Sequence, residues 1–241
     1  MHRAHDYEAL MRGWKEWAPA HGASCEVFAK FDGYDLYVVK KGSGGSYLSA
    51  GIHGDEPAGP WGLWEWASGV GEGHLLNHPF TLFPCLNPWG LERNIRLGAS
   101  GEDLNRLFHD RAHPLVSAWR SLLKEERFEI CICLHEDYDA IGFYGYEISQ
   151  GASKAEGGFV SCEVHLPREP DGEVEGLPVK KGLVQTEEEL SSLDEWTEDV
   201  PEAVELFRQF SDHTLTFETP SEEGWSSRIA TQVAFLTGVL E

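Results

Sequence analysis

The sequence predicts an α/β protein with a largely parallel sheet and helices on both faces. Short apolar runs typical of strands alternate with longer segments whose apolar residues recur at helical spacing. One run, residues 128–134 (FEICICL), is apolar throughout, as in a strand buried on both faces of a parallel sheet. The 241 residues show no internal repeat and no clear linker, so we expect one domain over residues 1–241.

The expected elements follow a regular order along the chain. Helices are expected at residues 6–18, 57–67, 113–126, 200–210 and 224–240. Strands are expected at residues 25–31, 34–40, 46–52, 80–87, 128–134, 144–149 and 213–218. Residues 87–106 are expected to form a long polar loop. The Gly-, Glu- and Pro-rich residues 150–200 have no clear pattern beyond one candidate helix near residues 186–193.

Composition excludes some partners. The chain has 19 Lys and Arg against 41 Asp and Glu, a net charge of −22. Such a charge opposes binding to nucleic acid or to anionic membranes. The N-terminus has no apolar signal-peptide region, and no apolar run approaches the ~18 residues of a membrane span. The five cysteines are odd in number and indicate reduced thiols, so we expect a cytoplasmic protein.

Polar side chains follow four of the expected strands. His53 and Glu56 come after the strand at 46–52, and an arginine-rich loop follows the strand at 80–87. His135 follows the apolar strand, and Glu218 ends the strand at 213–218. Ligands of such folds bind at the carboxyl ends of the strands. These residues are therefore expected to converge on one site.

Two histidines and one carboxylate form a known catalytic zinc set with an open fourth position. A further carboxylate, such as Glu218, can then act as general base and acid. Arg106 can bind a substrate carboxylate, Asn105 can add a donor, and a second arginine can stabilise an oxyanion. Each residue alone also has a purely structural interpretation: a core histidine, a helix start or a surface ion pair. Their joint occurrence in this order favours a site.

Three further carboxylates, Asp55, Glu136 and Asp137, lie beside the expected ligands. One of them could accept a hydrogen bond from a metal-bound histidine. Because these carboxylates lie near the expected site, a second metal ion could also bind there. The chain contains neither GxxxxGK[ST] nor GxGxxG, so a nucleotide-binding function has no support.

The motifs resemble those of the zinc carboxypeptidase family. HxxE stands at residues 53–56, the carboxylate-binding motif GEDLNR at 101–106, a strand-final histidine in CLHED and a strand-final glutamate in LTFE. The resemblance runs from about residue 46 to 238 and implies a mixed, mostly parallel eight-strand sheet between helices. It implies one Zn²⁺ held by His53, Glu56 and His135, with Glu218 as general base and Arg96 as the oxyanion arginine. It also implies that Asn105 and Arg106 bind a substrate carboxylate. The family's phenolic tyrosine has no clear match here, and Tyr144 is a candidate substrate-binding residue.

The family has two branches. One contains metallocarboxypeptidases and murein peptide amidases, and the other contains the succinylglutamate desuccinylase and aspartoacylase type of N-acyl-amino-acid deacylase. The deacylases usually carry an additional C-terminal β domain, whereas 23 residues (241 − 218) follow Glu218 here. We therefore expect a metallocarboxypeptidase or peptide amidase that uses metal-activated water on a small peptide with a free carboxylate. The alternatives are an acyl-amino-acid deacylase and, from another class, a metal- or peptide-binding protein without catalysis. Tyr144 has a second interpretation as a core or rim aromatic.

Overall fold

The computed structural model describes residues 3–184 and 197–240 of the chain. The helices are α1 (Tyr7–Ala20), α2 (Ala58–Ala67), α3 (Glu72–Asn77), α4 (Pro88–Arg93), α5 (Pro114–Leu123), α6 (Ala155–Cys162), α7 (Glu202–Gln209) and α8 (Trp225–Leu240), with 3-10 helices η1 (Arg3–His5) and η2 (Leu104–Arg106). The strands are β1 (Ser24–Phe31), β2 (Tyr34–Lys41), β3 (Ser46–Ala50), β4 (Phe80–Phe83), β5 (Ile130–Asp137), β6 (Tyr144–Ser149), β7 (Gly172–Val174), β8 (Leu177–Lys180), β9 (Leu183–Val184) and β10 (His213–Pro220). The helix expected near residues 186–193 lies outside the described residues. Among the described helices, none combines the length and the apolar character of a membrane span.

The described strands form one mixed sheet of ten, in the order β1-β2-β4-β3-β5-β10-β6-β9-β8-β7. Neighbouring strands are parallel at its centre, from β4 through β3 and β5 to β10. Both flanks are largely antiparallel, so parallel pairing is less general than expected. The expected count of eight strands is wrong. The sequence places seven strands by residue range, and the other three, β7, β8 and β9, have two to four residues, too few to show an alternating pattern.

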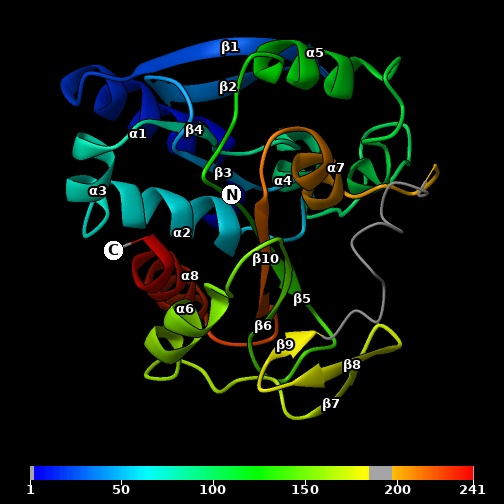
Figure 1. Ribbon diagram of the computed structural model, residues 1–241. Helices are drawn as coiled ribbons and strands as arrows, with labels where there is room; N and C mark the ends of the chain where they lie inside the picture. Colours follow the sequence, from blue (N-terminus) through cyan, green and yellow to red (C-terminus); the bar gives the residue numbers. More distant parts are fainter. Residues whose placement is uncertain (1–2, 185–196, 241) are drawn as a thin grey trace.

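The residues of β5 alternate between two apolar layers, which explains its continuous apolar run. Ile132 and Leu134 pack in the layer with α1, α2, α6 and α8, whereas Cys133 packs in the layer with α5 and α7. Figure 1 shows these two groups of helices on opposite faces of the sheet. By the same alternation, His135 lies on the face of α7 and Glu136 lies on the face of α2 and α8.

Residues 87–106 are more regular than the long loop that the sequence indicated. Asn87 accepts a hydrogen bond from the Gly90 backbone at 2.9 Å and begins α4, and Pro88 occupies the first turn. Asn94 ends α4 with φ of 54°. A helix of six residues is too short for an apolar stripe, so periodicity missed it. These turns fold the arginine-rich segment back towards the sheet.

Candidate metal centre

The segment GIHGDEPAG, residues 51–59, connects β3 to α2 and contains two candidate ligands, His53 and Glu56. Gly51 has φ of +64°, a conformation that favours glycine. A β-carbon on Gly54 would lie 2.1 Å from the carbonyl carbon of Gly90, so a side chain does not fit there. The turn that contains His53 therefore requires glycine both before the histidine, at Gly51, and after it, at Gly54.

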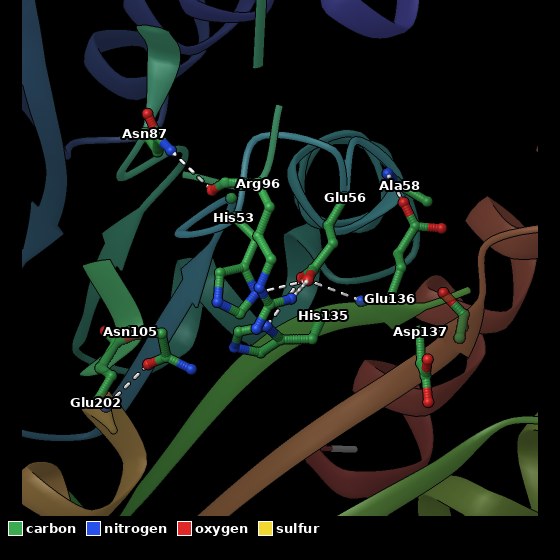
Figure 2. A network of polar contacts seen from close by, with 12 residues as sticks. His53, Glu56, Ala58, Asn87, Arg96, Asn105, His135, Glu136, Asp137 and Glu202 are labelled. Carbon is green, nitrogen blue, oxygen red and sulfur yellow. Dashed lines mark hydrogen bonds and ion pairs between the residues drawn. The ribbon is translucent and has the colours of Figure 1, made fainter. Parts of the chain in front are cut away.

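The side chains of His53, Glu56 and His135 meet at one point. His53 Nδ1 lies 2.5 Å from Glu56 Oε1, and His135 Nδ1 lies 2.9 Å from Glu56 Oε2. All three are buried, and one ligand atom from each lies within 4.8 Å of the others. Figure 2 shows both rings directed at the carboxylate. This donor set fits one Zn²⁺, and it is the one such group in residues 3–184 and 197–240.

The electrostatics of the group favour a cation. Burial lowers the pKa of His53, but the charge of Glu56 and the hydrogen bonds that the imidazole donates to Asp103 and Glu56 outweigh it and raise the pKa to about 8. Burial raises the pKa of Glu56, but His53 and His135 outweigh it and hold the pKa well below its usual range. The negative potential that retains protons on the imidazoles also attracts a metal ion, which competes with those protons.

Asp103 holds the first histidine from the other side. Its Oδ1 lies 3.1 Å from His53 Nε2 and also accepts the Asn105 backbone N–H at 3.0 Å. A carboxylate in this position fixes the tautomer and orientation of a metal-binding imidazole. The sequence indicates Asp55, Glu136 or Asp137 for this role, but the structure brings Asp103 to His53 instead. Its place directly before Leu-Asn-Arg in GEDLNR was the available signal.

Arg96 lies beside the group with its side chain 40% exposed. Its Nη1 donates to Glu56 Oε1 and its Nε donates to Asp103 Oδ2, both at 3.2 Å. These two ion pairs hold the guanidinium at the edge of the candidate metal site. A cation in this position can donate to negative charge that develops on a substrate carbonyl oxygen.

Asn105 and Arg106 approach the same edge from η2. Asn105 is buried, and its Oδ1 accepts the backbone N–H of Glu202, the first residue of α7, at 3.0 Å. Figure 2 shows its amide nitrogen directed towards His135. Arg106 Nη1 donates to the Asn105 carbonyl at 3.2 Å. The Asn105 amide can therefore present a donor near the candidate ligands, and the charge of Arg106 contributes to lowering the pKa of the nearby Asp103 carboxyl.

Glu218 lies in β10, opposite His135 of β5 and Tyr144 of β6. Its half-buried side chain is on the same face of the sheet as His135, because laterally paired residues share a face. Desolvation raises the pKa of Glu218 to about 8, His135 opposes this increase, and Glu56 adds to it. A carboxyl group that gains and loses a proton near neutrality is suited to general acid–base chemistry.

Tyr144 is buried, and its hydroxyl donates to Asp137 Oδ2 at 2.8 Å. Its ring packs edge-on against Tyr146 at 5.8 Å. The structure thus brings Tyr144 next to Glu218, with its hydroxyl bonded to a protein carboxylate. Its role in substrate binding stays a prediction.

Glu136 is fully engaged by protein groups. Its two carboxylate oxygens accept from Arg228 Nη1 and from the Ala58 backbone N–H, each at 2.7 Å. Its own backbone N–H donates to Glu56 Oε2 at 3.2 Å. Sequence reasoning missed Arg228, because its position on the last helix carried no motif.

The family model of the succinylglutamate desuccinylase/aspartoacylase catalytic domain matches residues 45–131. This stretch includes HxxE and GEDLNR and ends before His135. No curated protein sequence matches the chain.

Solved structures resemble almost the whole chain. A candidate metallopeptidase from Shewanella denitrificans is 20% identical, with a TM-score of 0.84 over 98% of this chain and 90% of that one. A metallo-carboxypeptidase from Burkholderia cenocepacia is 17% identical, with a TM-score of 0.69 over 97% and 67%. A metallo-carboxypeptidase from Pseudomonas aeruginosa, in complex with (2-guanidinoethylmercapto)succinic acid, is 16% identical, with a TM-score of 0.63 over 98% and 70%. The chain therefore has the zinc carboxypeptidase-like fold.

Proposed function

We propose that this protein is a zinc-dependent hydrolase that cleaves an amide bond next to a carboxylate-bearing residue, as a metallocarboxypeptidase or peptide amidase. One observation carries the proposal. Both imidazole Nδ1 atoms lie within 2.9 Å of the Glu56 carboxylate, next to a half-exposed arginine. A cluster of ion pairs that only stabilised the fold would not need the partly exposed Arg96 at its edge.

His53, Glu56 and His135 would hold the ion, and Asp103 would orient His53. When bound, Zn²⁺ supplies a Lewis acid that polarises a carbonyl and lowers the pKa of water to about 7. Glu218 would accept the proton of the attacking water at its carboxylate and return it to the leaving amine. Arg96 would donate to the carbonyl oxygen as negative charge develops there.

Asn105 and Arg106 would bind the free carboxylate of the substrate. A guanidinium can form two parallel hydrogen bonds with a carboxylate, and the Asn105 amide adds a third donor. This contact would place the neighbouring amide bond between the metal ligands and Glu218. Tyr144 would contribute to substrate binding through the rim that it shares with Asp137.

A second candidate function rests on a specific observation. The family model that matches residues 45–131 is that of a desuccinylase and aspartoacylase catalytic domain. An N-acyl-amino-acid deacylase would use the same metal ligands and base. The two functions differ in the substrate: a deacylase acts on the acyl group of a single amino acid, and a carboxypeptidase or amidase acts on a peptide.

The test combines metal analysis with a substrate panel. The purified protein is loaded with one equivalent of Zn²⁺ and offered blocked dipeptides, their C-terminal amides, murein-type peptides and N-acyl amino acids. We expect hydrolysis of the peptides with a free carboxylate and little hydrolysis of the matching amides. Exclusive turnover of N-acyl amino acids would replace the proposal with the deacylase. Bound zinc without turnover of any substrate would identify a non-catalytic metal-binding protein.

A further inference from the structure

Helix α8 contacts the back of the candidate metal centre at two places. Arg228 Nη1 donates to Glu136 Oε1 at 2.7 Å, and Gln232 Nε2 donates to the His135 carbonyl at 2.9 Å. Arg228 and Gln232 are four residues apart, so they lie on the same face of the helix. The residues that they contact lie 92 and 97 positions away in the sequence.

The contact through Glu136 extends to the ligand Glu56 by two routes. The Glu136 backbone N–H donates directly to Glu56 Oε2 at 3.2 Å. The Glu136 carboxylate also accepts the N–H of Ala58, the first residue of α2, at 2.7 Å. Ala58 lies two residues after Glu56, so this bond holds the chain on which the ligand is carried.

The side chains of Arg228, Glu136 and Gln232 are largely or fully buried, so neither contact of α8 is a surface interaction. The Glu136 side chain is fully buried and that of Arg228 is 14% exposed. Gln232 is completely buried and also donates to Thr219 Oγ1 of β10 at 3.0 Å. A β-carbon on Gly62 of α2 would lie 2.5 Å from Gln232 Cβ, so the two helices pack closely. Figure 1 shows α8 alongside α2.

We propose that Arg228 and Gln232 of α8 are positioning residues of the metal centre, which set the placement of Glu56 and His135 and thereby the affinity for Zn²⁺. Arg228 acts through Glu136, and Gln232 acts through the His135 backbone. Neither touches the reacting atoms. This inference rests on the metal site of the proposed function and extends it to the last helix of the fold.

The alternative is that α8 contributes only to general stability. The two cases differ in metal affinity. Groups that orient metal ligands typically change affinity or activity by about 10–100-fold when they are removed. A buried residue of the same helix that does not reach the site lowers stability without this effect. Thr231 is such a residue, because it is completely buried and its hydroxyl donates to Ser227 within the helix at 2.7 Å.

The experiment measures the Kd of Zn²⁺ by chelator competition and the Tm of the metal-free protein, for wild type and four variants. The variants are Arg228→Gln, Arg228→Lys, Gln232→Met and the control Thr231→Val. We expect Arg228→Gln and Gln232→Met to weaken Zn²⁺ binding by about 10-fold or more. Arg228→Lys should recover part of the loss, because it restores the charge opposite Glu136. Thr231→Val should leave the Kd within about twofold, whatever its effect on Tm.

The Co²⁺-loaded proteins provide a spectroscopic measurement. The visible absorption bands of Co²⁺ depend on ligand geometry, so they should change in Arg228→Gln and Gln232→Met but not in Thr231→Val. Unchanged Kd and spectra in the first two variants would overturn the inference, as would an equal loss in the control. If Arg228→Gln does not fold, Gln232→Met and Arg228→Lys decide. A wild-type protein that binds no Zn²⁺ would instead contradict the proposed function.

Discussion

The two sides of the candidate site differ in how their polar groups are held. The ligand side comprises His53, Glu56, His135 and the groups that bond to them, and it lies around the ends of the central strands β3 and β5. The side chains of the three candidate ligands are at most 5% exposed. Both nitrogens of His53, both oxygens of Glu56 and Nδ1 of His135 have partners within the protein, including Asp103. This side is therefore preorganised before any ligand binds.

The proposed substrate side comprises Asn105 and Arg106 of η2 together with the edge of the sheet at β6 and the β7–β8 hairpin, and several residues at that edge are exposed. Tyr146 donates to Glu175 at 3.0 Å, and Glu175 is an exposed residue at the turn of that hairpin. Tyr138 and Ile141, in the segment between β5 and β6, are 72% and 68% exposed. Residues of this kind can exchange water for a substrate at low cost. We therefore expect metal binding to depend on the centre of the fold and substrate specificity to depend on its edge.

We expect the largest effect from a substitution that removes the negative charge of Glu56, the candidate ligand that both histidines contact. Glu56→Gln keeps the shape of the side chain but leaves the two imidazoles without the carboxylate that both contact. We expect bound zinc to fall from about one equivalent to below ~0.1, with loss of all turnover. Metal analysis after gel filtration measures this. A variant that still holds a full equivalent would show that the ligand side does not depend on Glu56.

Glu218→Gln should lower turnover without changing metal binding, and it therefore distinguishes catalysis from the ligand side. The substitution removes the proton acceptor but no candidate ligand, so zinc content should stay near one equivalent. We expect kcat to fall on the order of 10²–10⁴-fold, the usual contribution of a general base. Steady-state kinetics and metal analysis of the same preparation check both parts. Activity within a few-fold of wild type would remove Glu218 from this role.

Arg106→Ala should affect the substrate side through binding. Loss of a charged hydrogen bond worth about 1.5–3 kcal/mol predicts a KM for free-carboxylate substrates about 10–100-fold higher, with little change for the matching amides. Arg93→Ala is the matched control, because Arg93 lies in α4, packs over the Trp89 ring and bonds to Tyr34. Equal effects of the two substitutions would argue against a carboxylate site at Arg106.

The smallest effect is expected at the sheet edge. Tyr146→Phe removes the hydrogen bond to Glu175 and keeps the ring that packs on Tyr144. We expect a loss of about 0.5–1.5 kcal/mol in the free energy of unfolding and an unchanged Kd for Zn²⁺. Urea unfolding and chelator competition measure these quantities, with Tyr138→Phe as the exposed control. Weakened zinc binding would mean that the two sides are coupled.

Local patterns in the sequence determined the helices and strands that carry the site. The apolar run 128–134 predicted a strand buried on both faces, and β5 is that strand because Ile132 and Cys133 enter different apolar layers. Glycine and proline around His53 predicted a turn from strand to helix, which the structure contains. Three residues at the ends of two strands predicted one metal-binding group, and their ligand atoms lie within 4.8 Å of one another.

The groups that hold that site in place come together through tertiary packing, and the sequence did not indicate them. Asp103 rather than Asp55 contacts His53, and Arg228 reaches Glu136 across 92 positions of sequence. The strands β7, β8 and β9 are likewise too short to be detected from sequence periodicity. Their pairing brings the sheet to ten strands among the described residues. The physical reason is the same in each case. A motif specifies the residue types that chemistry needs, whereas the partners of a buried polar group are set by packing between distant elements, which no local pattern encodes.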